Sequence, residues 1–296
     1  SVVGDANALL AVKITTLPAS GTLLLSGVAV TAGQTVSVTD ISAGHLTYAP
    51  AANSSGTAAT TFTFQVQDNG GTANSGVDLD ATPRTLTIDI TAANDAPVLT
   101  GLATTAATVN EETATAQTVA DLLGSRTDVD TATGAHSADN GILTGMAVYA
   151  TDETGIGGGH WEYSVDSGSN WATLAPTAGD VVLLRSTDQV RFVPDSLNGT
   201  TGHLSYYAWD QATGMAGSTV SNVAGDANLA NRGGTSSYSV DAGTVTLTVT
   251  DVNDAPTITN GAPAQSVNEE GSLTVTGLSF GDVDISARVD GDTTND

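Results

Sequence analysis

Cysteine is absent from the chain, and lysine occurs once, at Lys13. Without cysteine there is no disulfide framework and no zinc thiolate site. Acidic residues number 32 against 7 lysines and arginines, which gives a formal charge of −25. Because nucleic acid and anionic lipid would repel such a surface, we expect neither as a partner. Long apolar runs are also lacking, so we expect no membrane insertion.

Aromatic residues are scarce, at 4% of the chain, whereas small and β-branched residues such as alanine, valine and threonine are abundant. Side chains of this kind fill the thin core between two packed sheets. The composition is typical of a secreted bacterial β-protein that meets millimolar calcium, and an acidic soluble protein without a metal is the alternative. The chain begins at Ser1 without a signal peptide, from which we expect a mature or excised segment.

Short segments that alternate apolar and polar residues occur along the chain, separated by clusters of Gly, Asn, Pro and Ser. This alternation predicts half-buried strands, and the clusters predict turns. The predicted strands are 9–17, 35–41, 45–50, 61–68, 85–91, 142–150, 160–166, 180–185, 189–195, 203–210 and 244–251. One helical turn is predicted at 116–125, where Val119, Leu122 and Leu123 share a face. We therefore expect an all-β fold of antiparallel Greek-key sandwiches.

The tetrapeptide NDAP occurs twice, at 94–97 and 253–256, each time after a predicted strand. Each copy is followed by VNEE and then by DVD, which ends at 130 in one case and at 284 in the other. The repeated order predicts tandem modules in a linear rod, with NDAP at the boundaries. The predicted domains are 1–95, a sandwich lacking its first strands; 96–254, a complete and longer sandwich; and 255–296, the opening strands of a further module.

Acidic residues gather at these boundaries, where carboxylates brought close together would repel. A hard cation resolves the repulsion, and Ca²⁺ accepts a mixture of Asp, Glu, Asn and carbonyl oxygens. If the first strand of a module runs away from the linker and the second returns, NEE lies at the far end and DVD at the near end. The alternative is that these are turn residues that cap strands. The candidate calcium ligands are Asn94, Asp95, Glu111, Glu112, Asp128, Asp130, Asp210, Asp251, Asn253, Asp254, Asp282 and Asp284.

The order DVNDAP, VNEE and DVD resembles the calcium-linker signature of cadherin repeats. A closer resemblance is to the cadherin-like and VCBS-type tandem repeats of giant bacterial RTX-type surface adhesins. GMAVYATDETG, RFVPDSLNGT and YYAWDQATG are similar to the longer repeat variety, and AVKITTLPASGTLLLSGVAVTAGQ is similar to the shorter one. The resemblance covers nearly the whole chain. It implies calcium-rigidified, rod-forming modules at the bacterial cell surface, with extension or adhesion as their task and neighbouring repeats as partners.

The chain also departs from these families in two respects. NDAP has a single asparagine where animal cadherins extend the linker, so the exact ligand set is left open. The glycine-rich calcium nonapeptide of RTX proteins does not occur.

The unequal ends of the chain raise a second hypothesis. Residues 255–296 carry the kind of opening strands that residues 1–95 lack, so copies of the chain could join head to tail by strand donation into an open filament. The alternative is an excised part of a longer array, in which the neighbouring sequence belongs to the same polypeptide.

SVDSGSNW, at 164–171, matches the S-x-D-x-G-x-x-W pattern of the Asp-box hairpin. On the structural interpretation, Asp166 and the glycine shape the turn and Trp171 packs beneath it. On the other interpretation, the chain is a carbohydrate-binding module that contacts a surface glycan through Trp161, Tyr163 or Trp171.

Catalytic patterns are weak throughout the sequence. The histidines, His45, His136, His160 and His203, are scattered without metal-ligand spacing. The chain contains no G-x-S-x-G elbow and no P-loop. Paired carboxylates are plentiful, but they lie at boundaries, so a glycosidase is a weak alternative. We expect the chain not to be an enzyme.

Overall fold

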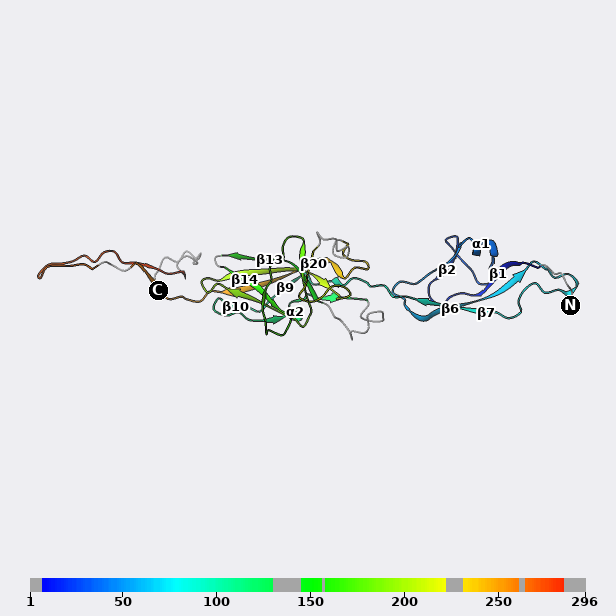
Figure 1. The fold of residues 1–296 in the computed structure, drawn as a ribbon, viewed down its shortest axis with the longest axis horizontal. Coiled ribbons are helices and arrows are strands. Elements are labelled where there is room, and N and C mark those ends of the chain that lie inside the picture. Colours follow the sequence, from blue (N-terminus) through cyan, green and yellow to red (C-terminus); the bar gives the residue numbers. More distant parts are fainter. Residues whose placement is uncertain (1–6, 130–144, 156–157, 222–230, 261–263, 285–296) are drawn as a thin grey trace. The chain divides into compact units, whose positions relative to one another are not determined.

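The computed structural model describes residues 7–129, 145–155, 158–221, 231–260 and 264–284. The chain divides into two units, of which one runs up to Ala93 and the other begins at Asn94 (Figure 1). Both are built almost entirely from strands that pack as sheets. The predicted all-β sandwich fold is confirmed.

The first unit packs a four-stranded sheet against a three-stranded one. The larger sheet has the order β4 (Thr35–Ser37), β1 (Leu9–Thr16), β6 (Gly56–Asp68) and β7 (Arg84–Ile90). The smaller has the order β3 (Val28–Ala29), β2 (Thr22–Leu25) and β5 (Leu46–Ala49). A short 3-10 helix, η1 (Ala73–Ser75), follows β6. Strands of both sheets bury their apolar residues in one core, which contains Ile14, Leu23, Val30, Val36 and Phe62.

A short helix in the first unit overturns part of a predicted strand. The segment 35–41 alternates like a strand, but β4 ends at Ser37 and α1 (Val38–Ser42) follows. The Ser37 hydroxyl caps this helix, because it accepts the amide of Asp40 at 3.0 Å and donates to the Asp40 carboxylate at 2.6 Å. The strand prediction is therefore wrong beyond Ser37, because the capping hydrogen bonds stabilise a helix although the sequence alternates like a strand.

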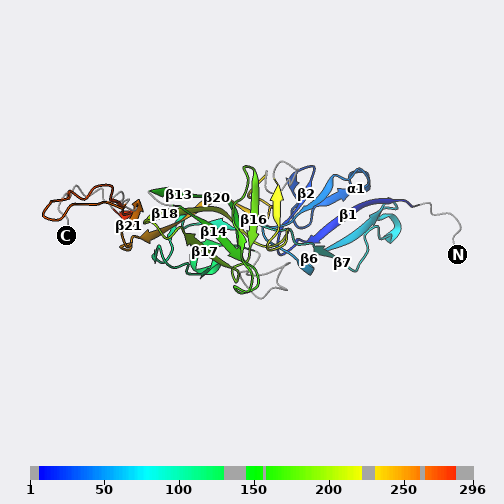
Figure 2. The ribbon, with the colours of Figure 1, turned by 60° about the vertical axis from the view of Figure 1, so that its left-hand side comes forward.

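The second unit is larger and also has two main sheets. The seven-stranded sheet has the order β10 (Val109–Asn110), β20 (Tyr238–Thr250), β18 (Thr200–Trp209), β13 (Gly145–Gly155), β16 (Asp180–Leu184) and β19 (Thr219–Ser221), with β9 (Ala103–Thr105) also on β20. The four-stranded sheet has the order β11 (Gln117–Thr118), β17 (Gln189–Pro194), β14 (Gly159–Ser164) and β15 (Ala172–Thr173). Figure 2 shows β13, β18 and β20 in one layer and β14 and β17 in the other. The pairs of β9 and β10 with β20 are parallel, unlike the antiparallel pairs around them.

The seven-stranded sheet buries apolar residues on both faces. Successive residues of a strand point to opposite faces, and in β13 Met146 and Val148 enter the core shared with the second sheet. Ala147, on the other face, joins a separate cluster with Trp209 and Tyr238. The main core therefore accounts for only part of the buried surface of this unit.

The helical turn predicted at 116–125 is confirmed as the short helix α2 (Val119–Leu122). Val119 and Leu122 are buried, and Leu123 is buried just after the helix ends. Thr118 caps the helix, and its side chain accepts the amide of Asp121. The amide of Gly124 then donates to the buried Tyr206 hydroxyl at 2.8 Å, which fixes this segment to the seven-stranded sheet.

The two units share one arrangement of strands. The orders β4–β1–β6–β7 and β3–β2–β5 in the first unit correspond to β16–β13–β18–β20 and β15–β14–β17 in the second. The second unit adds β9 and β10 on β20 and β11 on β17. It also has the antiparallel pair β8 (Val98–Leu99) with β12 (Arg126–Thr127). A similar antiparallel pair, β21 (Thr257–Asn260) with β22 (Ser279–Gly281), follows the second NDAP.

Candidate metal centre

The second NDAP boundary is organised around the side chain of Glu111. The parallel pairing of β10 with β20 is continued by a hydrogen bond of 3.1 Å from the Glu111 amide to the Thr250 carbonyl. This register directs the carboxylate to the linker, where Oε1 accepts the amide of Val252 at 2.6 Å. The Glu111 side chain has no exposed surface. Its Oε2 has no hydrogen-bond partner among the described residues.

Burial raises the pKa of Glu111 above its usual value, because the charged form loses hydration. The amide of Val252 acts in the opposite direction by stabilising the carboxylate. The negative charges of Asp251 and Asp254 raise the pKa further. Glu111 is thus a buried acid close to other negative charges, and a nearby cation would offset the repulsion by Asp251 and Asp254 and favour the charged carboxylate.

Asp254 and Asp284 lie together at the same boundary. The Asp254 amide donates to Asp284 Oδ2 at 2.6 Å, and the Asp284 amide donates to Asp282 Oδ1 at 3.1 Å. The other carboxylate oxygens, Asp254 Oδ2 and Asp284 Oδ1, are buried and have no partner in the part of the chain that the structure describes. The NDAP and DVD motifs of this boundary therefore lie in contact.

The remaining candidates at this boundary have other surroundings. Asp251 Oδ1 accepts the amide of Gly199 at 3.0 Å, so this oxygen also stabilises a turn. The Asn253 side-chain amide donates to the Asp254 carbonyl at 3.0 Å. Glu112 is exposed and lies in the turn that follows β10. Of the two glutamates in NEE, only Glu111 reaches the linker.

The residues around the first NDAP that belong to the second unit form a hydrogen-bonded group. The Asn94 side-chain amide donates to Asp210 Oδ2 at 2.8 Å and to the Ser236 carbonyl at 3.0 Å. Asp210 Oδ1 accepts the amide of Ala212 at 2.8 Å. Sequence reasoning missed Ser236, because a backbone carbonyl leaves no signal in residue identity. Asp95 and Asp128 are half-buried, and Asp130 lies outside the described residues.

Within the described ranges, no three His, Asp or Glu side chains converge closely enough to hold a metal ion as they stand. The oxygens without partners at Glu111, Asp254 and Asp284 are of the chemical type that Ca²⁺ prefers. The donor set of the second boundary therefore fits calcium in chemistry.

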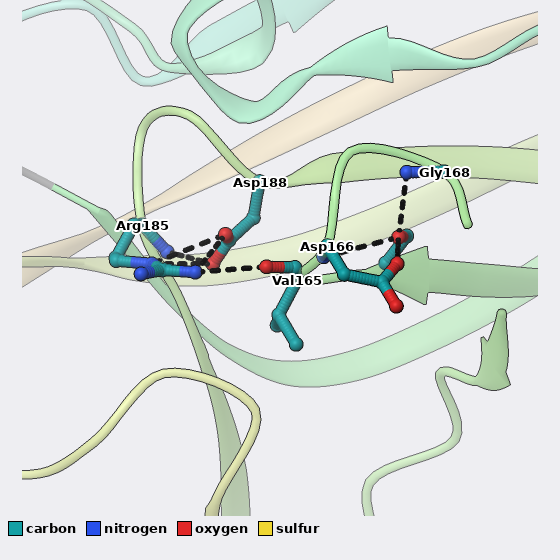
Figure 3. Close-up of polar contacts among 6 residues, drawn as sticks. Val165, Asp166, Gly168, Arg185 and Asp188 are labelled. Atoms are coloured by element: carbon teal, nitrogen blue, oxygen red, sulfur yellow. Dashed lines mark hydrogen bonds and ion pairs between the residues drawn. The ribbon is translucent and has the colours of Figure 1, made fainter. Parts of the chain in front are cut away.

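The Asp-box segment forms a closed hairpin turn (Figure 3). Asp166 Oδ1 accepts the Ser164 hydroxyl at 2.7 Å and the Asn170 amide at 2.8 Å, and Oδ2 accepts the Asn170 side chain at 2.6 Å. The Asn170 side-chain and backbone donors, followed by Ser164, lower the pKa of Asp166 to about 2. Gly168 has a φ of 85°, which a residue with a Cβ rarely adopts. Asp166 and Gly168 thus shape the turn, as the structural interpretation predicts.

Next to this hairpin, Arg185 and Asp188 close the turn between β16 and β17 (Figure 3). Asp188, whose side chain is 2% exposed, accepts Arg185 Nη2 at 2.8 Å and the Arg185 amide at 2.7 Å. Arg185 Nη2 also donates to the Val165 carbonyl at 3.0 Å, which links the two turns. The Asp188 carbonyl accepts the amide of Val119, so the same turn holds α2.

The aromatic residues near the hairpin are mostly committed to packing. Trp161 is 3% exposed and meets Phe192 edge to face, with ring centroids 5.4 Å apart. The Arg191 guanidinium lies 4.0 Å from the centre of the Trp171 ring and binds Glu162 at 2.6 Å. Trp161 is therefore part of the core, and Arg191 covers one face of the half-buried Trp171.

Comparison with protein families gives a match within the first unit. Residues 2–80 match the family model for a bacterial Ig domain. No curated protein matches the chain. Such domains are typically non-enzymatic modules of extracellular surface proteins, which indicates a structural or adhesion-type role. None of the helices in the described residues is long and apolar enough to span a membrane.

Proposed function

We propose that this chain is a structural segment of a bacterial extracellular adhesin or surface fibre, and that Ca²⁺ bound at the module boundaries stiffens it. The bacterial Ig match of residues 2–80 supports the general class. The observation that carries the calcium proposal is the buried Glu111 carboxylate, whose Oε2 has no partner among the described residues although Asp251 and Asp254 lie nearby.

At the second boundary, Glu111, Asp254 and Asp284 would supply the oxygens that the described residues leave without partners. Asp251, Asn253 and Asp282 would complete the set. Bound Ca²⁺ supplies positive charge that turns mutual repulsion of the carboxylates into shared attraction. Glu111 belongs to the body of the module and Asp254 to the linker, so one ion would join the two.

At the first boundary, the corresponding donors would be Asn94, Asp95, Asp128 and Asp210, with Asp130 as a further candidate. Asn94 and Asp210 are already held together by a hydrogen bond of 2.8 Å. The prolines of the two NDAP sequences, Pro97 and Pro256, fix one backbone angle in each linker. Cation binding and proline would together limit bending between modules.

Small-angle X-ray scattering tests this proposal. We expect the 296-residue chain to have a larger maximum dimension and a narrower distribution of shapes in Ca²⁺ than in chelator. Mg²⁺ at the same ionic strength is the control, because it demands a tighter octahedral geometry than this mixed oxygen set offers. Identical profiles in Ca²⁺ and chelator would contradict the proposal, as would an equal response to Mg²⁺.

A further inference from the structure

A small pocket lies beside the second half of β13 in the second unit. β16 pairs with β13 only from Met146 to Val148, so this edge of β13 has no strand partner beyond Val148 among the described residues. The pocket has a volume of 130 Å³, and β13, the start of β14 and the segment around β15 line it. The lining residues that matter for its chemistry are Thr151, Asp152, His160, Trp161, Thr173 and Leu174. None of them is a candidate calcium ligand.

Hydrogen bonds within the sandwich hold the walls of this pocket in place. The Thr151 hydroxyl donates to the Leu174 carbonyl at 3.2 Å, which joins the seven-stranded sheet to the segment that follows β15. The Leu174 amide donates to the Trp161 carbonyl at 2.7 Å. Leu174 is itself 1% exposed, so its position is fixed by the core. The pocket is therefore formed by the fold, as ligand sites usually are.

The indole N–H of Trp161 is the unusual group in this pocket. Trp161 is 3% exposed, and its Nε1 is buried without a hydrogen-bond partner in the part of the chain that the structure describes. A Cβ added at Gly202 of β18 would lie 3.2 Å from Trp161 Cζ2. The next residue of β18, His203, pairs with Asp152. Because Nε1 and Cζ2 are bonded to the same ring carbon, the N–H lies on the ring edge at the level of Asp152.

The groups that line the pocket select a hydroxyl as their partner. The indole N–H can only donate a hydrogen bond, whereas the exposed carboxylate of Asp152 can only accept one. A hydroxyl does both, because its oxygen accepts the N–H and its proton binds the carboxylate. An anion would be repelled by Asp152 and by a chain with a formal charge of −25. A cation cannot accept the hydrogen bond that the indole offers.

We propose that this pocket binds one saccharide unit of a glycan, with the Trp161 N–H and the Asp152 carboxylate as the groups that recognise it. A sugar ring carries hydroxyls on neighbouring carbons, so it can bind both groups at once. Its size also fits: 130 Å³ exceeds the share of about 30 Å³ that one water occupies and is below the about 300–1,000 Å³ of pockets for drug-sized ligands. His160, whose side chain is 47% exposed, leaves the glycan a way out to solvent.

This inference gives the second unit a binding role in addition to a structural one, and it does not rest on calcium at the boundaries. NMR of the tryptophan indole N–H groups in the isotopically labelled chain tests it, because each of the three tryptophans gives its own signal. The probes are methyl α-glucoside, methyl α-mannoside, methyl β-galactoside and N-acetylglucosamine. We expect at least one of them to shift the Trp161 signal in a saturable way, equally in Ca²⁺ and in chelator. The Trp171 signal, from the ring at the Asp-box turn, should not move.

A charge-removing variant tests the second recognition group. Asp152→Asn should weaken binding of the sugar that shifts Trp161 by about tenfold, as the loss of a charge-assisted hydrogen bond would. The matched control is Asp241→Asn, at an exposed carboxylate of the same unit that lies outside the pocket. It removes the same charge and should leave the affinity unchanged.

Three results would overturn the proposal. The first is that none of the sugars shifts the Trp161 signal in a saturable way. The second is that Asp241→Asn weakens binding as much as Asp152→Asn does, which would make the effect one of net charge. The third is a larger shift with N-acetylglycinamide than with any sugar, which would assign the pocket to an amide ligand such as a peptide.

Discussion

The carboxylate of Glu111 and the backbone amide of Val252 are joined by a hydrogen bond of 2.6 Å, although 141 residues separate them in the chain. The bond connects the turn after β10 in the second unit to the linker that follows β20. It uses only one oxygen of Glu111, and the other is buried without a partner in the described structure. Because only one of its two oxygens is hydrogen-bonded, the stability of the second unit should depend on both calcium and pH through this carboxylate.

Calcium should stabilise the second unit, and Glu111→Gln should remove most of that effect. Glutamine keeps an oxygen for the Val252 amide but loses the charge that a cation needs. All three tryptophans, Trp161, Trp171 and Trp209, belong to this unit, so thermal unfolding followed by tryptophan fluorescence reports on it alone. The matched control is Glu112→Gln, an exposed neighbour, which should keep the calcium response. Equal losses in the two variants would argue against a site at Glu111.

In chelator, the second unit should be more stable at pH 5 than at pH 7. The folded-state pKa of Glu111 is raised above the unfolded value of 4.5, so the folded state binds the proton more readily. The resulting stability is present at low pH and is lost as pH rises through the folded pKa. Urea unfolding at several pH values measures this slope, and Glu111→Gln should flatten it. A natural chain whose stability rises monotonically over this range would contradict the assignment.

Asp188→Ala should destabilise the second unit by about 1–3 kcal/mol, because it leaves the Arg185 amide and side chain without their acceptor. The control is Arg84→Ala, which removes an exposed ion pair with Asp80 in the first unit. Exposed pairs of that kind contribute little to stability, because water and salt screen them. Urea unfolding gives the free energy of unfolding of each variant. It is followed by tryptophan fluorescence for Asp188→Ala and by far-UV circular dichroism for Arg84→Ala. A smaller loss of unfolding free energy in Asp188→Ala than in Arg84→Ala would contradict the role of Asp188 in holding this turn.

Tyr206→Phe should cost about 1–3 kcal/mol, since the buried amide of Gly124 would lose its acceptor. The tyrosine ring stays in place in this variant, so the change isolates the hydrogen bond from packing. Hydrogen exchange of the Gly124 amide should accelerate in parallel. Tyr149→Phe, at a half-buried tyrosine of the opposite face, is the control and should change stability less.

Alternation and turn residues were sufficient to predict the longer strands, but not the short ones such as β8 to β12. β13, β16, β17 and β20 all overlap their predicted segments, and β17 and the second half of β20 place apolar side chains on a buried face at period two. The same rule failed at 38–41, because the hydrogen bonds of the Ser37 cap stabilise a helix there despite the alternating sequence. It also could not show that both faces of the seven-stranded sheet are buried, since Trp209 and Tyr238 meet only after folding.

The sequence predicted which motifs belong to the candidate site. It did not predict which residue of each motif faces the linker, or which backbone groups take part. NEE contains two glutamates of the same chemistry, and only the parallel register of β10 on β20 decides that Glu111 is buried and Glu112 exposed. Backbone groups such as the Val252 amide and the Ser236 carbonyl have no signature in residue identity. The Asp-box turn was predictable in detail, because its bonds link residues within a few positions of one another.

The parallel pairing of β10 with β20 has a mechanical meaning. Val109 lies near the start of the second unit and Val249 near its end, so tension applied to the two ends of the unit pulls these neighbouring strands in opposite directions along their length. The hydrogen bonds of a strand pair lie across that direction and must therefore yield together rather than one at a time. A module closed in this way, with β9 and β10 both parallel to β20, resists stretching by shear between its early strands and its last long strand.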